Sequence, residues 1–429
     1  NGGWQYSEVD RQADGGEDGY DSMGSKGNAK NILAVGAVRD IPGGYEKPSD
    51  VRASGFTSFG PPDDGRVKPD VVGNGVGLLS PNADGDDTYA RLSGTSMSAP
   101  NVTGAIGLLH EYYKRLNGDD QVMRASTVKS LLIQTTNEAG NNPGPDYKFG
   151  WGLVNIRQAA DIIKLDNKLG GTVIQELTLN EGDTLRVPVE VSPNEDEMNI
   201  TVGWTDPAGD SPSPQLDPST KMLVNDVDMK LIGPNGNHHP WKLDRDNPSA
   251  AATRGENDVD NTEKITVFDP SEGSYIVQIT HEGSLRNGSQ KVSLILDRGA
   301  GERYDISGEV TIQSNSEPAA GVKMYLSGFS EDTVVTDSTG NFTFYGQYNG
   351  DYTIEPAADG ITFDPSSQNV IVDGNNVTGV NFTANTPGYR NITLRLNTAT
   401  LSDTLQPNDT LQVRGNIAGT SDGADQLPD

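Results

Sequence analysis

The chain has 429 residues, of which 61 are acidic and 32 basic, so its formal net charge is −29. A field of that sign repels nucleic acid and anionic membrane surfaces, and we expect neither as a partner. The absence of cysteine excludes disulfides, zinc–thiolate sites and thiol nucleophiles. No apolar run approaches the roughly 18 residues of a membrane span, so we expect no membrane insertion.

Residues 1–165 have the pattern of an α/β domain. The apolar run 32–38 is brief and ends in turn residues, which fits a buried parallel strand. Apolar side chains at helical spacing predict one helix over 97–116 and a second over about 123–136. A chain of this length exceeds what one core serves, so further domains are expected to follow.

From about residue 170 the helical period disappears and short strand-like segments take its place. They are 172–179, 184–191, 198–204, 227–232, 263–268, 274–280 and 290–296. Turn clusters separate them, which predicts a jelly roll or antiparallel sandwich over 170–299. A further β-sandwich is predicted over 303–385. Residues 388–429 are too few to bury a core of their own and predict the start of a truncated β module. The predicted fold class is therefore multidomain, α/β followed by all-β.

The stretch Gly94-Thr-Ser-Met-Ser-Ala-Pro100 places Ser96 at the start of the first predicted helix. A helix start carries unpaired N–H groups and partial positive charge, which would stabilise an oxyanion formed beside a Ser nucleophile. Gly94 permits a tight turn, and Pro100 is expected within the first turn, where its missing N–H costs nothing. A Ser before a helix is more often only an N-cap. A cap, however, does not specify six neighbours.

This stretch resembles the serine-bearing motif of the subtilisin-like serine proteases, the subtilases. Further blocks in the family's order are the run 32–38, the loop 56–61 with 68–71, and 150–155 with Ala159 and Ala160. The resemblance implies the C-terminal part of a three-layer α/β domain with a parallel sheet. Residues 202–206 and 223–228 resemble the jelly-roll barrel of alkaline bacterial subtilases, which is similar to the convertase P domain. Residues 303–385 resemble a carboxypeptidase-regulatory-like, Ig-like β-sandwich.

The subtilase resemblance makes Ser96 the nucleophile that attacks a peptide carbonyl and forms an acyl-enzyme. Asn1-Gly2-Gly3 fits the family's oxyanion-hole pattern, so Asn1 is the candidate second donor. The family's Asp and His precede that Asn, and we expect both to lie upstream of this chain. None of the four histidines replaces the missing base: His110 is 14 residues beyond Ser96, about 21 Å along a helix, and the others fall in the second domain. This polypeptide alone is therefore predicted to hydrolyse no peptide.

Asp226 and Asp228 are the candidate metal ligands. Alternation along a strand puts both carboxylates on one face, where they would repel each other unless a cation lay between them. We therefore hypothesise a structural Ca²⁺ there, with oxygens added by the loop 258–261, although the chemistry at Ser96 requires no cofactor. The acidic loops at 8–21 and 84–87 fit solvated loops as well as calcium sites.

Together these features predict a secreted bacterial serine endopeptidase of subtilisin type, monomeric, with protein or peptide substrates. Two other functions fit the same residues. One is a non-catalytic pseudoprotease or adhesion protein whose β domains do the binding. The other is a hydrolase of non-peptide esters, which would use the same nucleophile.

Overall fold

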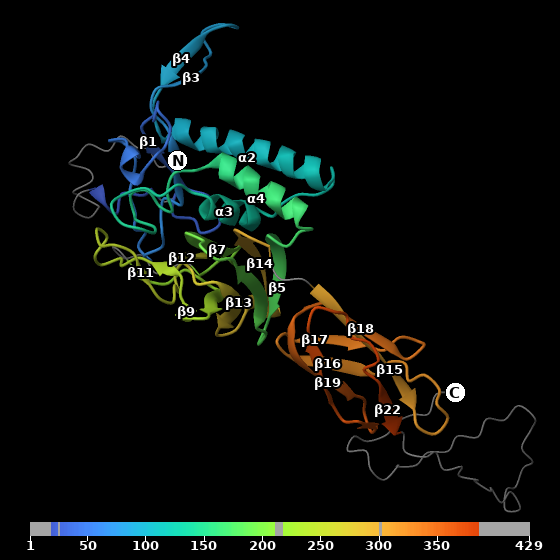
Figure 1. Ribbon diagram of the computed structural model, residues 1–429. Helices are drawn as coiled ribbons and strands as arrows, with labels where there is room; N and C mark the ends of the chain where they lie inside the picture. Colours follow the sequence, from blue (N-terminus) through green and yellow to red (C-terminus); the bar gives the residue numbers. More distant parts are fainter. Residues whose placement is uncertain (1–18, 25, 211–217, 300–302, 386–429) are drawn as a thin grey trace, which may run out of the picture. The chain divides into compact units, whose positions relative to one another are not determined.

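The computed structural model describes residues 19–385 except 25, 211–217 and 300–302. Its first part is α/β (Figure 1). Strands β1 (Val35–Val38) and β2 (Val71–Asn74) pair in parallel, with Val35 opposite Val71. Helices α2 (Thr95–Asn117), α3 (Ala125–Gln134) and α4 (Ile156–Lys168) pack beside them. The expected strand and both expected helices are present, and their ends lie within three residues of the predicted ones.

The α/β core forms where apolar strands meet the inner faces of the helices. Every residue of β1 is buried, and α2 contributes Val102 and Leu109 to the same core. Helix α4 begins at the side chain of Asn155, which accepts the N–H of Gln158 at 3.1 Å. Gly150 before it has φ 61°, and a Cβ there would lie 2.1 Å from the carbonyl oxygen of Pro69. The block 150–155 is therefore shaped by close packing against β2.

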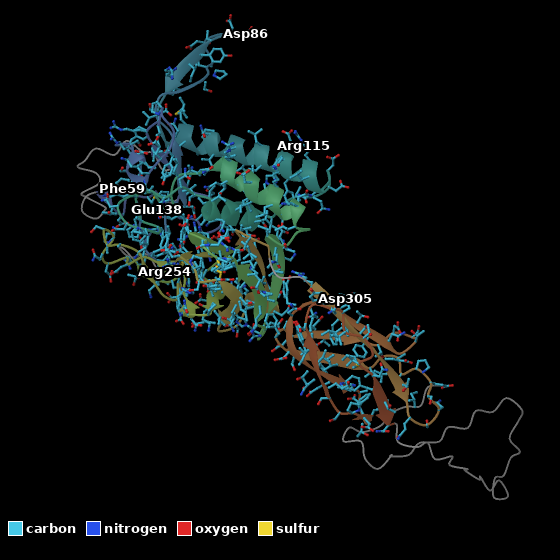
Figure 2. The ribbon with its side chains drawn as sticks, in the orientation of Figure 1. Phe59, Asp86, Arg115, Glu138, Arg254 and Asp305 are labelled. Carbon is cyan, nitrogen blue, oxygen red and sulfur yellow. The ribbon has the colours of Figure 1, made fainter. Side chains whose placement is uncertain are left out.

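A hairpin of β3 (Leu78–Pro81) and β4 (Tyr89–Leu92) precedes α2. Three of its large apolar side chains are exposed: Leu79, Tyr89 and Leu92. Figure 2 shows Asp86 at the tip of this hairpin. Strand β4 ends three residues before α2 begins, so the hairpin leads directly into the stretch that carries Ser96.

The next part consists of two four-stranded antiparallel sheets around one apolar core. One sheet has the order β12-β7-β14-β5 and the other β6-β13-β8-β9. The strands are β5 (Ile174–Asn180), β6 (Leu185–Val191), β7 (Glu197–Trp204), β8 (Asp226–Gly233), β9 (Gly236–His238), β12 (Thr262–Phe268), β13 (Gly273–Glu282) and β14 (Ser289–Leu296). A small pair, β10 (Trp241–Lys242) and β11 (Thr253–Arg254), lies between β9 and β12 in the chain. Eight strands in this order form a jelly roll, as predicted.

Helix α3 belongs to both of these parts. It packs on β7 and β14 of the jelly roll, and every residue from Ser126 to Gln134 is buried. The approach is close, because a Cβ at Gly203 of β7 would lie 2.2 Å from the hydroxyl oxygen of Ser130. Polar side chains fill the contact, including the hydroxyls of Ser126 and Ser293, 2.8 Å apart. The face of the sheet β12-β7-β14-β5 that points away from the jelly-roll core is therefore covered by α3.

Residues 303–385 form a second β-sandwich with sheets β18-β15-β22-β20 and β17-β16-β19-β21. The strands are β15 (Arg303–Ile312), β16 (Lys323–Gly328), β17 (Asp332–Val335), β18 (Asn341–Tyr348), β19 (Gly350–Ala357), β20 (Thr362–Asp364), β21 (Gln368–Val372) and β22 (Phe382–Asn385). Phe342 and Phe344 meet edge to face in its core, with ring centroids 5.8 Å apart.

The predicted fold class, α/β followed by all-β domains, is confirmed. In the described part of the chain no helix is both long and apolar enough to cross a membrane. The β module expected over 388–429 lies outside the described residues.

Candidate active site

Ser96 is the second residue of α2, and its side chain is exposed. The chain enters the helix at Gly94, whose carbonyl oxygen accepts the N–H groups of Met97 at 3.0 Å and Ser98 at 3.2 Å. The N–H groups of the first helical residues have no partner within the helix, so the helix start is electropositive beside the Ser96 hydroxyl. The helix start predicted at Ser96 is therefore present, and its role as a nucleophile stays a prediction.

Ser98, two residues further on, anchors this helix start to the sheet. Its side chain is fully buried, and its oxygen lies 2.8 Å from the carbonyl oxygen of Gly36 and 2.9 Å from that of Gly73. These carbonyls belong to β1 and β2 respectively. One hydroxyl thus fixes α2 against both parallel strands, and Ser96 is held on the opposite, exposed side of the turn.

Small residues are required where α2 crosses the strands. A Cβ at Gly73 would lie 2.9 Å from Cγ2 of Val102 and 3.1 Å from the Ser98 hydroxyl oxygen. The small residues at this crossing, Gly73 and Ser98, therefore have a packing cause. Small side chains let a helix start approach strand backbone closely.

Pro100 differs from the sequence expectation. Helix α2 begins at Thr95, so Pro100 is its sixth residue and lies beyond the first turn. In an α-helix the N–H of residue 100 would donate to the carbonyl oxygen of Ser96, and proline has no such N–H. The Ser96 carbonyl therefore lacks its helical donor, which the residue spacing alone did not predict.

Directly before β2, the buried carboxylate of Asp70 forms ion pairs with two lysines. Asp70 contacts Lys68 Nζ at 2.6 Å and Lys129 Nζ at 2.8 Å, and it accepts the N–H of Ala34 at 2.6 Å. Burial alone would raise the pKa of Asp70, but the two ammonium groups outweigh it and hold the pKa below its usual value. Burial lowers the pKa of Lys68 to about 8. This cluster fixes the chain that enters β1 and β2.

The other predicted participants are not assembled around Ser96 by the described residues. His110 lies on α2 itself, more than three turns beyond Ser96. His238 ends β9 and His281 lies in β13, both in the jelly roll, and His239 follows His238. Asn1 lies outside the described residues. Within the described ranges Ser96 therefore has a helix start but no histidine base.

Asp226 and Asp228 lie at the beginning of β8, on alternate positions as expected. Asp226 accepts from Lys221 Nζ at 2.5 Å, and its other oxygen is buried and has no hydrogen-bond partner among the described residues. Burial, followed by the charges of Asp226 and Glu282, raises the pKa of Asp228 to about 7. Nearby Glu263 is fully buried with one unpartnered oxygen. Among the residues described, no three Asp, Glu or His side chains converge as metal ligands. Calcium at Asp226 and Asp228 stays a prediction.

Comparison with known proteins agrees with the sequence motifs. The family model of the subtilases matches residues 12–152. A second model, described as the second beta sandwich domain of a BOS complex subunit NOMO1-like protein, matches residues 302–385. The recognition of a subtilase segment followed by a β-sandwich is confirmed.

Individual relatives match about a third of the chain. C5a peptidase of Streptococcus pyogenes serotype M3 is 39% identical over 145 residues, covering 33% of this chain and 12% of that protein. Pyrolysin of Pyrococcus furiosus is 30% identical over 174 residues, covering 35% and 12%. Fervidolysin of Fervidobacterium pennivorans, a keratinolytic enzyme related to subtilisin, covers 84% of this chain and 52% of its own at 16% identity, with a TM-score of 0.26. The chain spans about 12% of the length of these curated relatives.

Proposed function

We propose that residues 1–165 are the nucleophile-bearing part of a secreted bacterial serine endopeptidase of subtilisin type. The observation that carries the proposal is the exposed Ser96 at the start of α2, anchored through Ser98 inside a segment that matches the subtilase family. Its substrates are proteins or peptides, and the protein acts as a monomer.

The chemistry begins with attack of the Ser96 hydroxyl oxygen on a peptide carbonyl carbon. The hydroxyl proton passes to a base and then to the leaving amine, and water hydrolyses the resulting ester. Backbone N–H groups at the start of α2 stabilise the negative charge on the carbonyl oxygen in the tetrahedral intermediate. Asn1 supplies a second donor to the same oxygen. The base and its carboxylate partner come from the family's His and Asp, upstream of these 429 residues.

The surface of α2 supports a contribution from further polypeptide. Gly104 and Gly107 lie in the middle of the helix, and apart from the helix's own backbone no atom of the described residues lies within 4 Å of either Cβ position; Leu108 beside them is 65% exposed. Glycine within a helix costs about 1 kcal/mol relative to alanine. A closely packed segment on that face would account for both the glycines and the exposed leucine. We infer that the rest of the catalytic domain packs there.

Labelling of the protein carrying its upstream residues with a fluorophosphonate tests this function. The expected result is one adduct per molecule that Ser96→Ala abolishes. Ser93→Ala is the matched control, since Ser93 is also exposed and lies three residues away. The 429-residue chain by itself should leave casein intact. Casein hydrolysis by that chain, lost in Ser96→Ala, would contradict the need for upstream residues.

The non-catalytic alternative has one observation in its favour, since the described residues bring no base to Ser96. It predicts no fluorophosphonate adduct even with the upstream residues present. A hydrolase of non-peptide esters would be labelled but would leave casein uncleaved.

A further inference from the structure

The jelly roll forms hydrogen bonds with Lys30 and Asn31, which lie shortly before β1 in the chain. The Asn31 carboxamide donates to the carbonyl oxygen of Asp206 at 2.8 Å and accepts the Asp206 N–H at 2.9 Å. The side chain thereby pairs with Asp206 as a neighbouring strand would. Asn261 of the jelly roll donates to the same Asn31 oxygen at 3.0 Å.

Lys30 adds a second set of contacts to the same place. Its ammonium donates to the Asp206 carboxylate and to the carbonyl oxygens of Pro207 at 2.8 Å and Met222 at 2.5 Å. An ammonium has three N–H donors, and all three are used on jelly-roll acceptors. The Asp206 side chain is fully buried and that of Lys30 is 10% exposed. The pair is therefore a buried ion pair whose partners come from different parts of the fold.

The jelly roll's own backbone orients the Asp206 carboxylate, which is the acceptor in these contacts. The Asp206 carboxylate accepts the N–H of Val224 at 2.9 Å and that of Asn225 at 2.8 Å, and these residues lead into β8. Asp206 is thus oriented by jelly-roll backbone as well as by its contacts with Lys30 and Asn31. We call the contacts of Asp206 with Lys30 and Asn31 the Asp206 clamp.

The clamp continues into the elements that hold the nucleophile. Three residues beyond Asn31, Ala34 donates its N–H to the Asp70 carboxylate and accepts the Asp70 N–H at 2.9 Å. Lys129 joins the two places, because its Nζ lies 2.8 Å from Asp70 and donates to the carbonyl oxygen of Lys30 at 3.1 Å. Strand β1 follows, and its Gly36 carbonyl contacts Ser98. A continuous path of contacts therefore runs from the clamp to the turn that carries Ser96.

We propose that Asp206 is a positioning residue for the reaction at Ser96. The clamp fixes the chain entering β1, and β1 fixes Ser98 and the start of α2. The jelly roll thereby acts on the rate of attack by Ser96 and not on stability alone. This inference rests on the proposed function of Ser96.

The test compares variants of the protein carrying its upstream residues. Asp206→Asn removes the counter-charge of Lys30, and Asn31→Ala removes the reciprocal pair while leaving Asp206 intact. The matched control is Val277→Ala, a fully buried substitution in the jelly-roll core. The readout is the second-order rate constant for fluorophosphonate labelling, per folded molecule, well below the melting temperature. We expect at least a fivefold slower rate in both clamp variants and a change of less than twofold in Val277→Ala.

A second measurement separates the failure of this inference from failure of the proposed function. Hydrogen exchange of the 429-residue chain should show faster exchange in residues 33–38 for Asn31→Ala and Asp206→Asn than for Val277→Ala. If the wild type is labelled and both clamp variants react at its rate, the positioning role is wrong. If the wild type is not labelled, the proposed function is wrong and with it the role of Asp206 in catalysis. Unchanged exchange in residues 33–38 would overturn the clamp itself.

Discussion

Asp70→Asn is the substitution whose cost can be worked most directly from the structure. Asparagine keeps the volume of Asp70 and an acceptor for the Ala34 N–H, but it leaves the Lys68 and Lys129 ammonium groups buried without a carboxylate. Removing one partner of a buried ion pair costs about 3–5 kcal/mol. At about 2–4 °C per kcal/mol for a domain of 150–250 residues, the melting temperature should fall by about 6–20 °C.

Differential scanning calorimetry at pH 7 measures this loss, with two variants as controls. Lys129→Met leaves the Lys68–Asp70 pair in place and should cost clearly less than Asp70→Asn. Replacing Lys68, Asp70 and Lys129 together by apolar residues of similar volume should recover much of the loss, because buried ion pairs are often no more stabilising than apolar packing. A melting temperature for Asp70→Asn within about 2 °C of the wild type would refute this reasoning.

Three further predictions concern pH, packing and calcium. Because Asp228 has a folded pKa of about 7 against 3.8 as its ordinary value, the folded state holds a proton that the unfolded state releases. The unfolding free energy in EDTA should therefore fall from about pH 4 to pH 7, less steeply in Asp228→Asn; equal slopes in urea titrations would contradict this. Gly73→Ala should cost about 1–3 kcal/mol, because its Cβ meets Val102 and Ser98, and an unchanged urea midpoint would be inconsistent with that packing. If Ca²⁺ binds at Asp226 and Asp228, adding CaCl₂ should raise the melting temperature of the wild type but not of Asp226→Asn; no rise in the wild type would remove the site.

Much of the fold could be predicted because its signals are local. The apolar run before β1, the helical spacing in α2 and α3, and the alternating strands of the jelly roll each lie within one short segment. The apolar residues Val128, Leu131, Leu132 and Ile133 predict the inner face of the second helix, and all four are buried in α3. The helix start that carries Ser96 was likewise predicted from one short stretch, and α2 begins there.

The contacts between parts could not be predicted from the same patterns. Lys30 and Asp206 are 176 residues apart, so no local pattern links them. Lys30, Asp206 and Lys129 are charged residues, which are mostly exposed in proteins. These side chains are buried because the jelly roll packs on the α/β part, and no local sequence pattern predicts that packing. In the opposite direction, Leu108 belongs to the apolar spacing that predicts its helix, and yet its side chain is exposed. Helical spacing identifies an apolar face but not what covers it.

Peptide mapping after fluorophosphonate treatment tests directly whether Ser96 is the nucleophile. In the protein carrying its upstream residues, trypsin cleavage after Arg91 and Lys114 yields a peptide of residues 92–114 that contains Ser93, Ser96 and Ser98. We expect a single phosphonyl adduct, located on Ser96 by fragmentation, and none in unfolded protein. A natively folded protein with no adduct, or with the adduct on Ser93 or Ser98, would contradict it.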